Sequence, residues 1–146
     1  MRKISIVLGF VGLLSIAFAI AGCSSNTSIT PPASGKTVAT ASAGNNLTAT
    51  LATADGSFKK GSQDFILTFA DASGKAVDVG SAAFNLHMAA MGSMAAMNNG
   101  ATLTTTGTPG VYKGNVKVEM GGDWQAQITY EGPAGKGSFA MPISAK

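Results

Sequence analysis

Apolar and polar side chains alternate with a period of two along the C-terminal part of the chain. Phe65, Leu67 and Phe69 share one parity, and Phe84 and Leu86 share one in a later run. A period of two places successive side chains on opposite faces of a strand, so each run predicts a strand with one apolar face. Turn residues separate these short runs, which predicts an all-β sandwich or barrel with no helix longer than about two turns. The inward parity predicts a core of Leu51, Phe65, Leu67, Phe69, Phe84, Leu86, Tyr112, Val116, Val118, Trp124, Ala126 and Ile128.

The longest alternation covers residues 112–130 and predicts a hairpin. The apolar positions of its first half end at Met120, and those of its second half begin at Trp124. A register shift of one residue would turn every side chain to the other face, so we expect a three-residue loop at 121–123 that pairs Met120 with Trp124. A last strand is expected at 138–143.

The N-terminus has the layout of a secretory signal. Arg2 and Lys3 precede an apolar segment, residues 4–20, and the four residues that end at Cys23, I-A-G-C, resemble the bacterial lipobox with Ile in place of the commoner Leu. The resemblance implies that residues 1–22 are removed and that a lipid on Cys23 anchors the protein to a membrane. Because Cys23 is the only cysteine, a disulfide framework is excluded.

This layout divides the chain into a signal peptide (1–22), a lipidated Cys with a flexible tether (23–46) and one folded domain (47–146). The tether is expected because its Ser, Thr, Ala, Gly and Pro residues bury too little apolar surface to become ordered. Removal of the two basic residues of the signal lowers the net charge from +3 to +1. The remaining charges form no basic patch, so a nucleic-acid partner is not expected.

Four of the seven methionines follow one another at a strict spacing of three: Met88, Met91, Met94 and Met97. Only Ala, Gly and Ser separate them, and the single histidine, His87, precedes the first. Thioether sulfur is a soft, neutral ligand that selects Cu(I), and unlike a thiol it cannot form a disulfide in an oxidising compartment. A period of three fits neither a strand nor one narrow helical stripe, so we expect a loop or one or two short helical turns.

The expected Cu(I) ligands are Met91, Met94 and Met97. Three further candidates are Met88, His87 and Met120. Met88 lies on the same face of its strand as Phe84 and Leu86, which favours core packing. His87 lies on the opposite face, where both a surface role and metal ligation stay open. Met120 is expected to face inward, and it would complete the site only if the methionine run folds over that end. Methionine also fills apolar gaps and contact surfaces, so an apolar contact role for the run stays open too.

Two sets of residues resemble the signatures of a known family. The first is a strand, an acidic turn and a Gly-Lys pair: Gly61, Phe65, Leu67, Phe69, Asp71, Gly74, Lys75 and Val77. The second is G-x-Y-x(3)-V-x(3)-M-x-G-x-W: Gly110, Tyr112, Val116, Met120, Gly122 and Trp124. The two signatures, in this order and spacing, resemble those of the YtkA-like domain. More distantly, the chain resembles the CopC-like copper-binding sandwiches. The resemblance implies an immunoglobulin-like antiparallel β-sandwich of about seven strands, in exported proteins often near copper handling or metal efflux. The family commonly has Pro among its methionines and a His later in the loop, and this chain departs from both features.

These observations favour an extracytoplasmic, lipid-anchored protein that binds Cu(I), with a metal-efflux or copper-assembly protein as partner. The alternative is a non-catalytic interaction domain whose methionine run contacts a protein partner. No enzyme is expected, because a lone His without a Ser or Cys nucleophile makes no triad. The expected location is the cell envelope, on its periplasmic or extracellular face. Ser24, in place of an Asp after Cys23, favours the outer membrane if the source is Gram-negative.

The anchor prediction is tested by Cys23→Ser. The thiol is the expected acylation site, so the variant should lose the acyl mass and leave the membrane fraction. Intact mass and membrane fractionation measure both effects. An unchanged acyl mass on the Ser variant would contradict the lipobox assignment.

Overall fold

The structure, a computed structural model, describes residues 35–146, and the regular elements in this range are all strands. They are β1 (Lys36–Gly44), β2 (Leu47–Thr53), β3 (Gly61–Ala70), β4 (Ser81–Met88), β5 (Met97–Gly100), β6 (Thr102–Thr105), β7 (Val111–Val118), β8 (Gly122–Gly132) and β9 (Gly135–Ala145). The expected signal, Cys23 and the first part of the expected tether lie outside the described residues.

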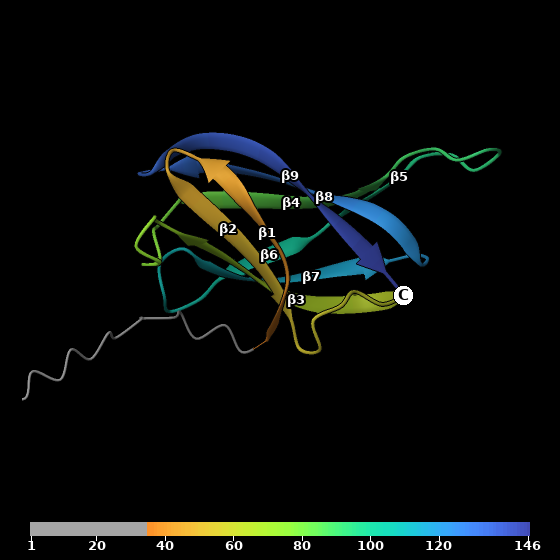
Figure 1. The fold of residues 1–146 in the computed structure, drawn as a ribbon, viewed down its shortest axis with the longest axis horizontal. Helices are drawn as coiled ribbons and strands as arrows, with labels where there is room; N and C mark the ends of the chain where they lie inside the picture. Colours follow the sequence, from red (N-terminus) through yellow and green to blue (C-terminus); the bar gives the residue numbers. More distant parts are fainter. Residues whose placement is uncertain (1–34) are drawn as a thin grey trace, which may run out of the picture.

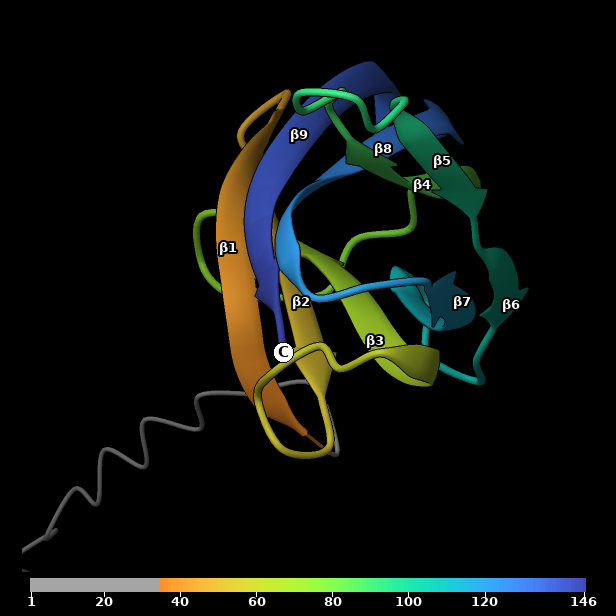
Figure 2. The same ribbon diagram turned by 90° about the vertical axis from the view of Figure 1, so that its right-hand side faces the viewer.

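The strands form two antiparallel sheets that pack face to face (Figure 1). One sheet has the order β1-β2-β3-β7-β6 and the other β5-β4-β8-β9. In Figure 2, β1 and β9 run side by side at one edge of the sandwich, and β5 and β6 lie at the other. With β1 set aside, the two orders match the ABED sheet of an immunoglobulin fold and a CFG sheet with a C′-type strand beside C. The prediction of an all-β, immunoglobulin-like sandwich is confirmed.

The core contains every residue that the alternation predicted. None of the twelve predicted side chains is more than 4% exposed. Phe69 lies among aromatic rings, with centroid distances of 6.0 Å to Tyr112 and 5.3 Å to Tyr130. Phe58 and Val79 are equally buried, and the alternation missed them because they lie in the connections before β3 and β4.

The predicted hairpin at 112–130 is wrong. β7 pairs with β3 and β6, whereas β8 pairs with β4 and β9, so the two strands belong to different sheets. Alternation shows only that both strands face one core, and strands that oppose each other across a sandwich meet this condition as well as paired strands do. The expected loop at 121–123 already contains the start of β8, and the true hairpin is β8–β9, closed by Gly132 and Gly135. The last strand is longer than the expected 138–143.

The prediction of a tether up to residue 46 is wrong for Lys36–Gly44, which forms β1 along the edge of β2. This strand has few large side chains, but Ala43 is buried and Val38 packs against the core. Asn45 and Asn46 have φ values of 52° and 58°, as the central residues of a type I′ hairpin turn require. The folded domain therefore begins before residue 47. β1 and β5, which fell in an expected tether and an expected loop, bring the count within residues 35–146 to nine strands instead of about seven.

The position of β1 predicts that the domain needs this strand. A chain that begins at Leu47 should be less stable than one that begins at Gly35, because it exposes the edge of β2 and uncovers core surface. The loss should be a large part of the roughly 5–15 kcal/mol that stabilises a typical domain. Thermal unfolding followed by circular dichroism measures it. Equal melting temperatures for the two chains would show that β1 is dispensable.

Candidate metal site

The methionine run folds back on itself as an extension of β4 and β5. Met88 and Met97 are cross-strand partners, and Met91 and Met94 form a second antiparallel bridge. In this bridge each backbone amide donates to the other residue's carbonyl, at N···O distances of 3.1 and 2.9 Å. Gly92 has a φ of 57°, which suits the first central position of a type II′ turn. We call residues 88–97 the methionine hairpin.

The expectation of a loop is confirmed for residues 89–96, which lie between β4 and β5 and form no helical turn, whereas the antiparallel bridge inside this loop was not expected. The sequence M-A-A-M-G-S-M-A-A-M is symmetric about its centre except for the central Gly-Ser pair itself. A chain reversal between Gly92 and Ser93 therefore turns a spacing of three into two cross-strand pairs.

The two pairs of methionines have opposite environments. Met88 is 2% exposed, and its partner Met97 is half-buried against the core. Met91 and Met94 are 54% and 42% exposed, and within the described residues they are the only large apolar side chains classed as exposed. Positions three apart on a strand lie on opposite faces, which explains the division. In Figure 1 the tip of the hairpin extends beyond the body of the sandwich, past the ends of β4 and β5.

Met91 and Met94 are close enough to share one ion. Side chains directly opposite on an antiparallel pair point to the same face, with Cβ atoms about 4.5–5.5 Å apart. The structure thus brings together two of the three expected ligands. It places the third, Met97, on the inner pair with Met88, where the predicted core role of Met88 is confirmed.

His87 is held by a chain of amide side chains on the outer face of the four-stranded sheet. Its Nδ1 lies 2.8 Å from Asn98 Oδ1, which also accepts a hydrogen bond of 3.3 Å from Asn85 Nδ2. Asn85 Nδ2 in turn donates to Gln127 Oε1 at 3.2 Å. A carbonyl oxygen can only accept, so the neutral His87 ring carries its proton on Nδ1 and leaves the lone pair of Nε2 free.

His87 and Met91 both line a groove whose other walls include Asp123, Gln125 and Pro142. The structure therefore brings the imidazole and one of the two exposed sulfurs to the same groove.

Met120 lies at the connection between β7 and β8. Its side chain is partly buried against the core, and its carbonyl accepts a 3.1 Å hydrogen bond from the indole of Trp124. Trp124 is 2% exposed, as the core prediction required. Met120 thus has a packing contact that explains it without a metal.

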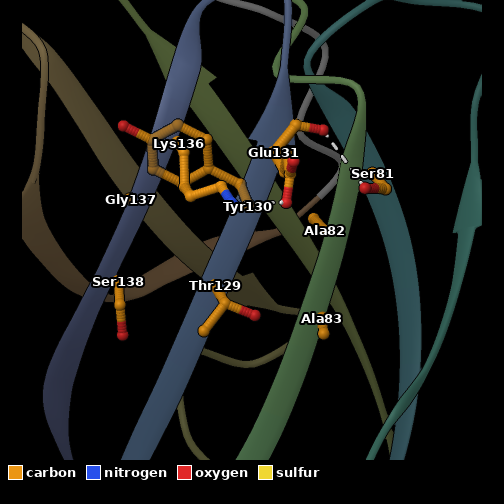
Figure 3. Close-up of a pocket in the computed structure, with 9 residues that line it drawn as sticks. All are labelled: Ser81, Ala82, Ala83, Thr129, Tyr130, Glu131, Lys136, Gly137 and Ser138. Atoms are coloured by element: carbon orange, nitrogen blue, oxygen red, sulfur yellow. Dashed lines mark hydrogen bonds and ion pairs between the residues drawn. The ribbon is translucent and has the colours of Figure 1, made fainter.

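The opposite end of the four-stranded sheet carries a shallow pocket with different chemistry (Figure 3). Its charged residues are paired with each other, Lys136 with Glu131 at 3.1 Å, and Ser81 Oγ donates to the Glu131 carbonyl. Within residues 35–146, no group of three or more His, Cys, Asp or Glu side chains is placed to hold a metal ion. The same range contains no helix long and apolar enough to cross a membrane.

The fold and the site define an immunoglobulin-like sandwich that carries an exposed pair of methionines on a projecting hairpin. The sequence model of the YtkA-like family matches residues 41–129, which is more than half of the chain. The chain therefore belongs to the YtkA-like family. Searches of curated proteins and of solved structures returned no match.

The first family signature forms the turn after β3. Asp71 Oδ1 accepts hydrogen bonds from the amides of Ser73 and Lys75 at 2.8 and 3.1 Å. The Ser73 hydroxyl and then the Lys75 amide lower the pKa of the Asp71 carboxyl. Gly74 supplies the left-handed φ of 82° that closes the turn. These residues specify a backbone turn, far from the methionine hairpin in the sequence.

The second signature positions core strands. Gly110 has a φ of 77°, and a Cβ there would lie 2.2 Å from the Val77 carbonyl oxygen. The Tyr112 hydroxyl donates a 2.6 Å hydrogen bond to the Gly80 carbonyl. Burial, and to a lesser degree the Asp78 carboxylate, raise the pKa of Tyr112 above its usual value. Both signatures therefore encode the fold, and the candidate site lies outside them.

The unequal exposure of the methionines predicts their order of oxidation. Hydrogen peroxide should convert Met91 and Met94 to sulfoxides well before Met88 and Met141, which are 2% and 0% exposed. Peptide mapping by mass spectrometry at increasing times measures each rate. Oxidation of Met88 as fast as Met91 would show that the hairpin does not hold the two pairs on opposite faces.

Proposed function

We propose that the protein is an extracytoplasmic lipoprotein, anchored through Cys23, that binds Cu(I) at Met91 and Met94 in copper handling or efflux. The observation that carries the proposal is the exposed, same-face methionine pair beside the Gly92 turn. Exposing two large apolar side chains at a projecting tip stabilises nothing in the fold, and such exposure usually marks a binding site.

The donor set favours Cu(I) over harder cations. Thioethers are soft and uncharged, whereas Zn²⁺ sites use thiolate, imidazole or carboxylate, and Mg²⁺ and Ca²⁺ use oxygen. The spacers Ala90, Ser93 and Ala95 are small, so nothing bulky next to the sulfurs blocks an approaching ion. A copper-assembly or metal-efflux protein is the proposed partner.

The remaining candidates take supporting roles in this proposal. Met88 and Met97 attach the base of the hairpin to the core, because one is buried and the other packs against it. Met120 packs beside Trp124. His87 stays available through Nε2 as a further donor in the groove that Met91 also lines.

A second candidate function rests on the same exposure. An apolar tip can dock into a groove on a protein partner through contact alone, and methionine suits such surfaces because its side chain adapts to different shapes. We propose no catalytic role under either candidate. The two functions differ in whether the sulfur atoms are needed.

The double variant Met91→Leu, Met94→Leu separates the two candidates. Leucine keeps the tip apolar but removes both sulfurs, so Cu(I) affinity should fall by at least about 100-fold if each lost ligand costs about 1.4 kcal/mol or more. Competition with a chromophoric Cu(I) chelator measures the affinity. Met97→Leu is the matched control and should bind Cu(I) like the wild type. Unchanged Cu(I) affinity in the double variant would exclude the tip pair as the site and leave the contact function.

The pH dependence of the same measurement reports the ligand type. Thioethers carry no proton to lose, so affinity through Met91 and Met94 should change little between about pH 5 and 7. A steep loss of affinity on acidification would instead require an imidazole ligand, since a free imidazole titrates near about 6.5.

A further inference from the structure

The methionine hairpin supplies too few donors to enclose a Cu(I) ion. Only Met91 and Met94 face outward at the tip, while Met88 and Met97 face the core. Each thioether is a neutral, weak donor, so affinity depends on how many of them surround the ion. An ion held by this pair alone keeps an open side that other ligands can reach, because the backbone of the tip extends beyond the sandwich (Figure 1).

The charges and the side-chain sizes at the tip indicate which partner can supply further ligands to the ion. Residues 79–112 contain no Asp, Glu, Lys or Arg, so the methionine hairpin and strands β4 and β5 carry no Asp, Glu, Lys or Arg side chain, and Asp123 is the one acidic residue that lines the groove with Met91. The same neutrality means that two copies of this chain would not repel each other there. Ala90, Gly92, Ser93 and Ala95 leave the backbone of the tip uncovered, so another tip can approach closely.

We propose that two copies of the chain share one Cu(I) ion, tip to tip, with Met91 and Met94 of each copy as its ligands. This proposal rests on the proposed function and names the partner at the same site. A two-fold axis through the ion presents the same pair from both copies, as a closed dimer requires. Four sulfurs then surround the ion, and no side chain from the core has to move.

Two other completions of the site are weaker. Met97 would have to leave its pairing with Met88 and its contact with the core. His87 keeps its Nδ1 hydrogen bond to Asn98 and offers one nitrogen, Nε2, so it would bring the donors from one chain only to three. Two tips that meet supply four sulfurs and leave the inner methionine pair in place.

The experiment titrates Cu(I) into the full chain in detergent micelles against a competing chelator. We expect the endpoint at one copper ion for two chains, and an apparent affinity that rises with chain concentration. X-ray absorption at the copper edge should show sulfur as the only ligand type, with a coordination number of four.

Ser93→Glu, with Ser93→Gln as its neutral match, tests the contact between tips directly. A carboxylate attracts a cation, so Cu(I) binding that weakens in the Glu variant and not in the Gln variant is the result expected from repulsion between two chains that bring like charges together. We expect the Glu variant to lose the two-chain complex and the Gln variant to keep it.

The outcomes distinguish the two proposals. An endpoint of one ion per chain, with mixed sulfur and nitrogen or oxygen ligands and an affinity independent of chain concentration, overturns the bridged dimer and leaves the proposed Cu(I) function standing. Absence of Cu(I) binding overturns both. Equal behaviour of the Glu and Gln variants also contradicts the contact between tips.

Discussion

The closure of two sheets over one apolar core determines which side chains this protein can use for function. Phe69, Trp124 and Leu67 lie in that core, and every long strand contributes alternate residues to it. Only side chains on the outer faces of the sheets and at the ends of the strands remain available for binding. On the four-stranded sheet the outer face holds His87 and neutral amides joined by hydrogen bonds, and the exposed methionine pair lies beyond the ends of β4 and β5.

The residues that define the family hold the two sheets and their turns in place, and they do not indicate which ligand the protein binds. Asp71 organises a turn with its carboxylate, Gly110 gives room to the Val77 carbonyl, and Tyr112 donates to Gly80. Each contact would be needed whatever the protein binds. Membership of the YtkA-like family therefore establishes the sandwich, and function has to be argued from the methionine hairpin, which the signatures do not include.

Alternation predicted the buried faces correctly because the pattern within a single strand is enough to show which of its side chains face the core. Strand pairing was predicted wrongly for β7 and β8 because parity is identical for paired strands and for strands that oppose each other across the core. β1 was missed since it buries small side chains, although Asn45 and Asn46 carried a turn signal. The hairpin was missed because a period of three was compared with straight elements, when its symmetry about Gly92 and Ser93 was the relevant pattern.

That symmetry also explains why four methionines are present when two are proposed to bind. With two alanines on each side of the turn, the outer and inner pairs fall on opposite faces. The inner pair buries its side chains and connects the hairpin to the sandwich, and this attachment opposes fraying of the tip. The outer pair inherits a defined geometry from the hydrogen bonds of the turn, so its two sulfurs start on one face before any ion arrives. Four identical residues thus have two roles: the inner pair attaches the hairpin and the outer pair is free to bind. The position of the turn decides which methionines form the outer pair.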